Sequence, residues 1–302
     1  MSLREGFLLF PTKQSPYYEE TAKVDMTILD KFNLKDHVAV VTGGVGFLGM
    51  EFCKTLAEAG AAVAVVDLNG DAANKVADGL IQDGYKAKGI AVDITKPDSV
   101  NAMAASVLST FGRLDVLVNS AALDPKFDPD AARSAKGIAL GAFEDYPLEQ
   151  WNAAMNVNLT GMFLVTQACV KPMIAQGKKG SIINICSTYG LNGPDQRIYI
   201  KDGKRVAYKP VYYTTTKAGV MGFTKYLAAY YAETEIRVNA LTPGGVFNNH
   251  EEYFVKNYSA KTILGRMARK DEMNGALLFL ASDASSYMTG NNVVVDGGWT
   301  AW

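Results

Sequence analysis

The sequence predicts an α/β protein built on a single Rossmann-type, doubly wound parallel sheet of about seven strands with helices on both faces. Short, β-branched apolar runs alternate with helical stretches of ten or more residues, which is the pattern of βαβ units. The runs are apolar throughout, as in strands that are buried on both faces. A glycine-rich turn joins the first run to the first helix, and Asp or Asn residues close several runs.

The expected elements follow in order along residues 37–302, which we interpret as one dinucleotide-binding and catalytic domain. Strands are expected at 38–41, 62–66, 88–92, 114–118, 181–186, 236–241 and 292–295. Helices are expected at 50–59, 71–83, 97–111, 149–176, 213–233 and 271–281. Residues 1–36 lack a sustained period and are expected to form an N-terminal extension. Two inserts, at about 123–147 and 191–210, interrupt the pattern, and the second predicts a β-hairpin that turns at Asp202-Gly203.

Composition excludes several classes of function. The formal net charge of -1 gives no overall attraction to nucleic acid or to an anionic membrane, so neither partner is expected. No apolar run has the length of a membrane span and no signal arrangement marks export, which together predict a cytoplasmic protein. Cys53, Cys169 and Cys186 lie in apolar runs without paired spacing, as reduced core residues do. With two histidines, His37 and His250, no metal site or His-based triad is expected.

The glycine-rich turn predicts a dinucleotide site. Gly44-Val-Gly46-Phe-Leu-Gly49 lies between a strand and a helix, the context in which glycines allow the backbone to approach a pyrophosphate at a helix N-terminus. Asp67 closes the next strand, where a carboxylate accepts hydrogen bonds from the adenosine ribose. No cation follows it, because the next residues are Leu68-Asn69-Gly70. A 2′-phosphate would therefore face an unpaired negative charge, and we expect NAD(H) rather than NADP(H) as the cofactor.

Tyr213 and Lys217 predict the reacting centre. On a helix they are i and i+4, so the two side chains leave the same face about one turn apart. An ammonium beside a phenol favours the phenolate, which lowers the pKa of the tyrosine and makes it a proton donor or acceptor near neutral pH. Ser187, upstream, is placed to orient a substrate oxygen. The alternative for the pair alone is a tyrosine on a packed helix face with a solvated lysine, and the glycine-rich turn favours the catalytic interpretation.

These residues resemble the short-chain dehydrogenases/reductases of the classical type over about residues 32–302. The resemblance implies that Asp93, in Val-Asp-Ile-Thr95, contacts the adenine, and that Asn119-Ser-Ala-Ala122 corresponds to the element after the fourth strand. It implies a catalytic set of Ser187, Tyr213, Lys217 and Asn158, in which Asn158 holds a water that joins Lys217 to a proton relay. It also brings Pro243-Gly244, with Val246 just after, next to the nicotinamide. The expected cofactor-binding residues are therefore Gly43, Gly46, Phe47, Leu48, Gly49, Asp67, Leu68, Asp93, Ile94, Asn119, Ala121, Tyr213, Lys217, Pro243, Gly244 and Val246.

The chain departs from the family pattern at four places, one of which is that Val246-Phe-Asn-Asn249 lacks the usual Thr after Pro243-Gly244. Phe47 stands where the family's turn has glycine, and Gly43, Gly46 and Gly49 follow the spacing of the extended, sugar-nucleotide branch. Ser120 replaces the second Asn of the element after the fourth strand. Ser187 and Tyr213 stand 26 positions apart, more than is usual in the family, because the second insert lies between them. That insert and Pro243-Gly-Gly-Val-Phe-Asn-Asn resemble a subgroup found with flagellin-modification and nonulosonic-acid pathways.

The resemblance implies an NAD(H)-dependent oxidoreductase that interconverts a hydroxyl and a carbonyl on a small polar, sugar-like molecule. Two alternatives remain open: a dehydratase, epimerase or isomerase that recycles bound NAD, and a non-catalytic NAD(H)-sensing protein. Both inserts leave from carboxyl ends of strands and are expected to cover the pocket. The cations of the second insert, Arg197, Lys201, Lys204, Arg205 and Lys209, indicate either a clamp for a phosphorylated or carboxylated sugar or, as the simpler interpretation, a solvated hairpin. A homodimer or homotetramer through helices 149–176 and 213–233 is expected from the family.

Overall fold

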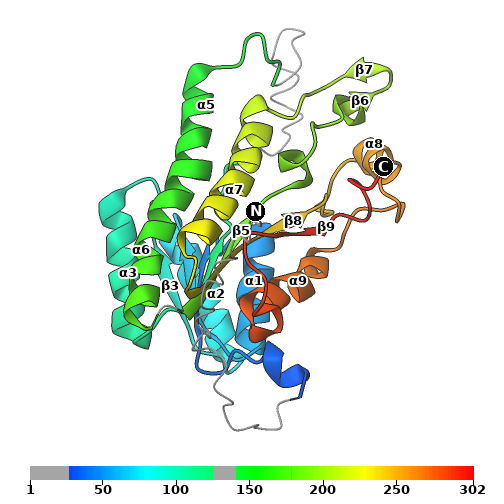
Figure 1. The fold of residues 1–302 in the computed structure, drawn as a ribbon. Helices are drawn as coiled ribbons and strands as arrows, with labels where there is room; N and C mark the ends of the chain where they lie inside the picture. The colour runs from blue at the N-terminus through cyan, green and yellow to red at the C-terminus, as the bar shows by residue number, and fades with distance from the viewer. Residues whose placement is uncertain (1–26, 125–140, 178) are drawn as a thin grey trace, which may run out of the picture.

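A seven-stranded parallel sheet forms the centre of the protein, in the order β3-β2-β1-β4-β5-β8-β9 (Figure 1). The computed structural model describes residues 27–124, 141–177 and 179–302. The strands are β1 (Val38–Thr42), β2 (Ala62–Asp67), β3 (Ala87–Ala91), β4 (Val116–Asn119), β5 (Lys179–Ile185), β8 (Glu235–Pro243) and β9 (Asn292–Val295). The predicted fold class is therefore confirmed. The direction of winding reverses between β1 and β4, which are neighbours, and open α/β sheets bind their ligands at such a point.

Helices cover both faces of the sheet (Figure 1). One core cluster joins the sheet to α1 (Phe47–Glu58), α2 (Gly70–Gln82) and α9 (Asn274–Ala281). The other joins it to α3 (Pro97–Phe111), α6 (Met162–Ala175) and α7 (Val211–Tyr230). Because β1 and β4 are buried along their whole length, their unbroken apolar sequence is explained by contact with both helical layers.

The expected single helix over 149–176 is interrupted. The structure has α5 (Leu148–Met155), a π-helical turn at Asn156–Gly161 and then α6. Such turns occur mostly at functional sites, and this one contains Asn158. By length and composition the stretch Leu148–Ala175 could cross a membrane, which by itself is weak evidence, and half of its tested window is buried inside the protein.

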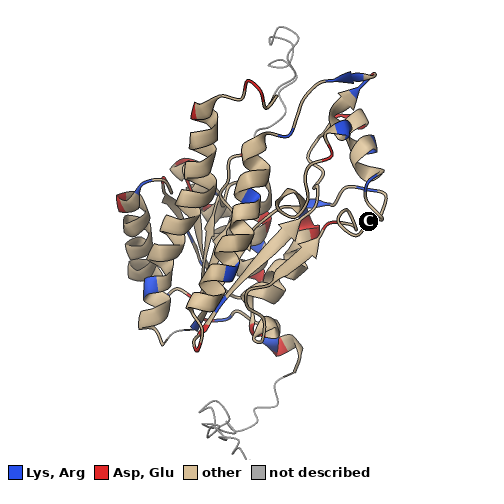
Figure 2. Cartoon of the chain, turned by 45° about the horizontal axis from the view of Figure 1, so that its top comes forward, with Lys and Arg blue, Asp and Glu red and all other residues tan. Residues whose placement is uncertain are grey.

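The second insert forms the predicted hairpin. Strands β6 (Ile200–Lys201) and β7 (Lys204–Arg205) pair antiparallel, and the turn residues Asp202 and Gly203 have φ of 51° and 74°. Asn257 of α8 (Glu252–Ser259) donates from Nδ2 to the carbonyls of Ile198 and Ile200 at 3.2 Å. Lys and Arg gather on this hairpin (Figure 2). Residues 125–140 of the first insert lie outside the described residues.

The predicted N-terminal extension, residues 1–36, is described only from residue 27. Leu34 is 1% exposed and belongs to the core cluster under α1 and α2. Its backbone N–H donates to the carbonyl of Ala59 at 2.8 Å. The end of the extension is thus part of the packed domain.

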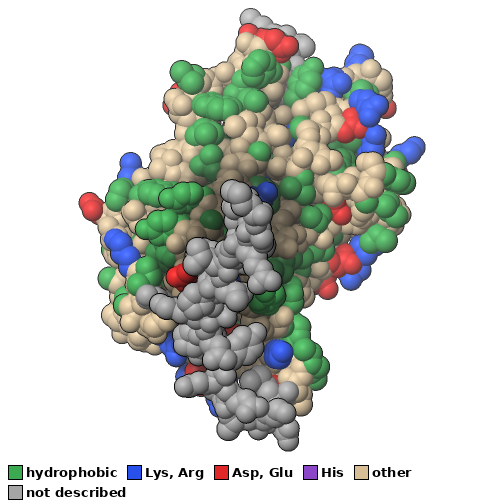
Figure 3. Space-filling model, viewed as in Figure 1, with side chains coloured by type: hydrophobic (Ala, Val, Ile, Leu, Met, Phe, Trp, Pro, Cys, Tyr) green, Lys and Arg blue, Asp and Glu red, His purple; other side chains and the backbone are tan. Residues whose placement is uncertain are grey.

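Aromatic side chains are exposed on α7. Tyr226 and Tyr230 are 64% and 67% exposed and stack on each other. Figure 3 shows other exposed hydrophobic side chains on the face formed by α5 and α7. Assembly through these helices stays a prediction, and the molar mass in solution is its test.

We predict that Asp115 stabilises the edge of the sheet opposite the strand carboxyl ends. It is 7% exposed, accepts from the Val38 N–H at 2.9 Å and pairs with both Arg113 nitrogens at 2.8 and 2.7 Å. Asp115→Ala leaves a buried N–H without its acceptor, so the free energy of unfolding should fall by about 2–4 kcal/mol in urea titrations. The matched control is Asp283→Ala, which removes an exposed pair with Lys179 and should cost at most about 1 kcal/mol. Equal losses in the two variants would contradict the assignment.

Candidate active site

The turns after β1 and β4 touch at the carboxyl edge of the sheet. The Thr42 hydroxyl accepts from the backbone N–H groups of Ser120 and Ala121 at 3.1 and 3.2 Å. Gly43 has φ of 66°, and a Cβ there would lie 2.8 Å from the Cα of Ala121. Glycine is therefore required at 43, both for its conformation and for space. Thr42 was not among the predicted site residues, although it ends the first strand.

The N-terminus of α1 is built to approach a phosphate. Gly46 is its N-cap, no side chain of the described residues caps it, and Phe47 and Leu48 open its first turn. A Cβ on Gly49 would lie 2.0 Å from the carbonyl oxygen of Gly43, so α1 packs directly on the turn. Free N–H groups at a helix N-terminus and the absence of side chains at 43, 46 and 49 fit the pyrophosphate of a dinucleotide. Phe47 is partly exposed, and its effect on cofactor binding stays a prediction.

Two acidic residues lie at the ends of neighbouring strands. Asp67 ends β2, where it accepts from the N–H of Val45 at 3.3 Å and of Asn69 at 3.2 Å, while Leu68 is 74% exposed. Asp93 follows β3 and accepts from the Thr95 hydroxyl and N–H at 2.6 and 2.9 Å, which lowers its pKa. The arrangement leaves Asp67 beside the glycine turn, as a ribose contact requires. Asp93 is turned toward Thr95.

Asn119 points away from the carboxyl edge. Its Nδ2 donates at 2.9 Å to Thr166 of α6 and to Asn184 of β5, and Asn184 donates in turn to Thr224 of α7. The side chain is 2% exposed and its Oδ1 has no partner among the described residues. This network fixes both helices to the sheet, and any cofactor contact from Asn119 is left to its backbone.

The packing of Ile94, Pro243, Gly244 and Val246 can be described, and their contacts with a cofactor stay a prediction. Ile94 contacts Gly161, where a Cβ would lie 2.7 Å from the Ile94 side chain. Pro243 ends β8, the N–H of Gly244 donates to the carbonyl of Val295 at 2.9 Å, and Val246 bridges to Ala268. The Gly245 N–H donates to the Tyr258 hydroxyl.

Ser187, Tyr213 and Lys217 come together between β5 and α7. Lys217 is 5% exposed, and its Nζ donates to the carbonyl of Ile185 at 2.8 Å. That nitrogen lies 5.8 Å from the centre of the Tyr213 ring. Gly190 permits this approach, because a Cβ there would lie 2.6 Å from the Lys217 carbonyl oxygen. Gly190 was not predicted as part of the site, and no local sequence pattern marks it.

The electrostatics of Tyr213 differ from the expectation. Burial raises the pKa of Tyr213 well above that of a free phenol, the Asp124 carboxylate raises it further, and a hydrogen bond with Ser187 opposes both. Burial also lowers the pKa of Lys217. The prediction that Lys217 holds the pKa of Tyr213 low is therefore wrong for the protein residues alone. Tyr213 is a protonated phenol at neutral pH, which is a proton donor.

Asn158 anchors the loop after β4. Its Oδ1 accepts from the Leu123 N–H at 2.6 Å, and its Nδ2 donates at 3.2 Å to the Leu123 carbonyl and to the Thr216 hydroxyl. Thr216 precedes Lys217 on α7. Asn158 thus joins the π-helical turn, the loop and the catalytic helix. Its predicted role in holding a relay water stays a prediction.

Aromatic side chains form the wall beside Tyr213. The ring of Tyr189 lies edge-on to Tyr213, with centroids 6.4 Å apart, and edge-on to Trp299 at 6.2 Å. Trp299, 7% exposed, stacks on Tyr258 at 4.2 Å. This cluster connects the second insert, α8 and the C-terminal segment around the phenol.

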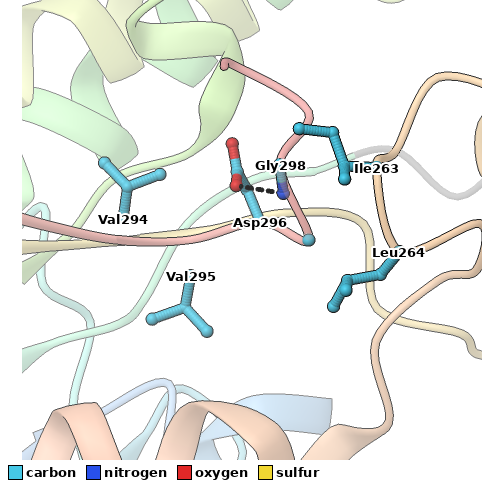
Figure 4. A pocket seen from close by; sticks show the side chains of 7 residues that line it. Ile263, Leu264, Val294, Val295, Asp296 and Gly298 are labelled. Atoms are coloured by element: carbon cyan, nitrogen blue, oxygen red, sulfur yellow. Dashed lines mark hydrogen bonds between the residues drawn. The ribbon is translucent and has the colours of Figure 1, made fainter.

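A shallow hollow of about 350 Å³ lies elsewhere, against the edge strand β9. Figure 4 shows its lining side chains, including Ile263, Leu264 and Val294, and the hydrogen bond from the Gly298 N–H to Asp296. None of Ser187, Tyr213, Lys217 and Asn158 lines it. It is not the reacting centre.

Comparison with known proteins agrees with this geometry. Residues 46–300 match a family model described as "Enoyl-(Acyl carrier protein) reductase". D-threitol dehydrogenase of Mycolicibacterium smegmatis is 34% identical over 286 residues, covering 93% of this chain and 99% of the relative.

Two solved structures share the fold. A short-chain type dehydrogenase/reductase from Mycobacterium marinum has a TM-score of 0.78 and 34% identity, covering 92% of this chain and 100% of that chain. A gluconate 5-dehydrogenase from Burkholderia cenocepacia J2315, in complex with NADP and tartrate, has a TM-score of 0.78 and 30% identity, covering 91% and 100%. The chain therefore belongs to the short-chain dehydrogenases/reductases, a family of nicotinamide-dependent oxidoreductases with this Rossmann-type fold.

Proposed function

We propose that the protein is an NAD(H)-dependent dehydrogenase that interconverts a hydroxyl and a carbonyl on a small polyhydroxylated molecule. The observation that carries the proposal is the convergence of Ser187, Tyr213 and Lys217 at the same sheet edge as the glycine turn. A binding protein without turnover would have no need of a buried phenol and ammonium on adjacent helical turns.

The side chains divide the proton chemistry among them. A bound nicotinamide supplies or accepts the hydride. Tyr213 gives a proton to the substrate oxygen during carbonyl reduction and takes it back during hydroxyl oxidation. Ser187 orients the same oxygen through its hydroxyl, which lies beside the phenol. Lys217, fixed by the Ile185 carbonyl, places its positive charge near the forming phenolate.

Asp67 supports NAD(H) over NADP(H). Its carboxylate lies at the end of β2 against the glycine turn, and neither residues 43–49 nor 68–70 contain Lys or Arg. A ribose 2′-phosphate would meet this charge without a compensating cation. The gluconate 5-dehydrogenase structure holds NADP, so the preference differs within the family and has to be measured for this chain.

The substrate class follows from the relatives and from the pocket wall. D-threitol and gluconate, in the names of the two relatives, are polyhydroxylated. The wall around Tyr213 combines aromatic rings with the polar side chains of the insert. Such a surface suits a molecule with apolar C–H faces and several hydroxyls.

We predict that Tyr213→Phe lowers kcat at least ~100-fold in an NADH absorbance assay with polyols and sugar acids, because the proton donor is lost. NADH binding should stay near normal. Tyr226→Phe, on the exposed face of α7, is the matched control and should behave as the parent protein. Full turnover by Tyr213→Phe would contradict the proposal. In the parent, NADH that returns to baseline while product forms would indicate the NAD-recycling alternative instead.

We predict that NADH binds at least ~10-fold more tightly than NADPH in calorimetric titrations, because a like-charge contact costs more than about 1.4 kcal/mol. Asp67→Asn should remove most of this difference. Asp71→Asn, an exposed residue of the first turn of α2, should keep it. Equal affinities for the two cofactors in the parent would make the NAD(H) assignment wrong.

A further inference from the structure

A second lysine lies on the catalytic tyrosine. The Nζ of Lys209 is 3.8 Å from the centre of the Tyr213 ring, closer than the 5.8 Å of Lys217. Its side chain is only 15% exposed. An ammonium within about 6 Å of a ring face is held there by the ring quadrupole. Lys209 therefore reaches into the reacting centre from the second insert.

The insert is built to place this residue. The Gln196 side chain accepts from the Lys209 N–H at 2.9 Å and donates to the Lys209 carbonyl at 3.4 Å. Pro210 follows at once and is the N-cap of α7, the helix that carries Tyr213. The backbone of Lys209 is thus fixed by Gln196 and by the start of α7 at Pro210. These two connections determine how far Lys209 lies from the Tyr213 phenol.

The counter-ion of Lys209 comes from a different segment, the loop after β4. Asp124 pairs with the Lys209 Nζ at 2.5 Å and is 50% exposed. It follows Leu123, whose backbone is held at both N–H and C=O by Asn158. The ion pair therefore spans from the loop after β4 to the insert, across the phenol. The Asp124 side chain is half exposed and can be solvated, whereas the Lys209 side chain is largely buried.

The other cations of the insert are committed elsewhere. Arg197 binds Asp195, Lys201 binds Glu251, and Arg205 lies over the Tyr208 ring. Lys204, in β7 of the hairpin, is exposed. A clamp made of all five cations is therefore not what the structure shows, and of these five cations Lys209 is the one that lies over the Tyr213 ring.

We propose that Lys209 binds a carboxylate of the substrate, which displaces Asp124. The largely buried ammonium of Lys209 needs a counter-ion. A substrate carboxylate can take the place of the half-exposed Asp124, so that Lys209 stays paired while Asp124 is solvated. A single ammonium can pair with a carboxylate or with a phosphate; we choose the carboxylate because gluconate, in the name of one similar structure, is a carboxylic acid. The inference rests on the proposed function and makes the substrate a polyhydroxy acid rather than a neutral polyol.

The test compares acids with matched neutral polyols: D-gluconate with D-glucitol, and D-threonate with D-threitol, with 6-phospho-D-gluconate as a phosphate arm. The parent should show a higher kcat/KM for each acid than for its polyol. Lys209→Met should lower kcat/KM for the acids about 10- to 100-fold, mainly through KM, as for a lost charged hydrogen bond. The ratio of acid to polyol should fall toward one, and Lys209→Arg should restore most of it.

Two further variants sharpen the result. Lys204→Met removes an exposed lysine of the same hairpin and should leave the acid-to-polyol ratio as in the parent. Asp124→Asn removes the competing carboxylate and should lower KM for the acids. An equal loss for acids and polyols in Lys209→Met would overturn the proposal, since Lys209 would then serve Tyr213 rather than the substrate. A dominant preference for the phosphate arm would overturn the carboxylate assignment.

A binding measurement separates this inference from the proposed function. Calorimetric titration of D-gluconate and D-glucitol into the parent and into Lys209→Met requires no turnover. If the parent binds gluconate and Lys209→Met does not, the carboxylate site at Lys209 is supported. If no NADH is formed in the same protein, the proposed function fails but this inference does not. Gluconate binding that is the same in both proteins, or absent from the parent, overturns the inference.

Discussion

The burial of Lys217 beside the partly buried Tyr213 is the constraint on which the rest of the structure depends. A phenol and an ammonium on adjacent turns of α7 can be buried only if the ammonium finds an acceptor, and the carbonyl of Ile185 at the end of β5 provides it. This bond ties the catalytic helix to the sheet edge. Gly190, whose missing side chain allows the close approach, and Asn158, which connects the neighbouring loop to α7, support the same junction.

Burial also decides the chemistry of the resting protein. Tyr213 is a neutral phenol at neutral pH and so carries the proton that carbonyl reduction needs, but its raised pKa makes it a weaker acid than a free phenol and makes its phenolate a stronger base. The Asp124 carboxylate acts in the same sense. Exchange of Asp124 for a substrate carboxylate, as we propose, would keep a negative charge beside Lys209 while the centre is in use.

Most of the architecture was predictable because it depends on local patterns. Apolar runs fixed the strands of the sheet, and the predicted helix 97–111 and strand 292–295 have the observed bounds of α3 and β9. Gly43 and Gly49 were predicted as cofactor residues because a side chain at either position would clash with the backbone. Asp67 was predicted because it ends the next strand. Three features were not predictable in this way. The π-helical turn contains Asn158, which bonds Leu123 and Thr216 far away in the sequence. The helix α8 is only eight residues long and lies in a polar and aromatic stretch. The position of Lys209 depends on its hydrogen bonds with Gln196.

The most direct test of this account is the ionisation of Tyr213 itself. In ¹³C-tyrosine NMR of the cofactor-free protein, the resonance that is missing from Tyr213→Phe can be followed as the pH is raised. A buried phenol facing Asp124, Ser187 and the two lysines should keep the chemical shift of the neutral form to about pH 10 or above, the pKa of a free tyrosine. If the chemical shift showed Tyr213 half ionised below about pH 8, this would contradict the claim that burial, rather than Lys217, controls the pKa of Tyr213.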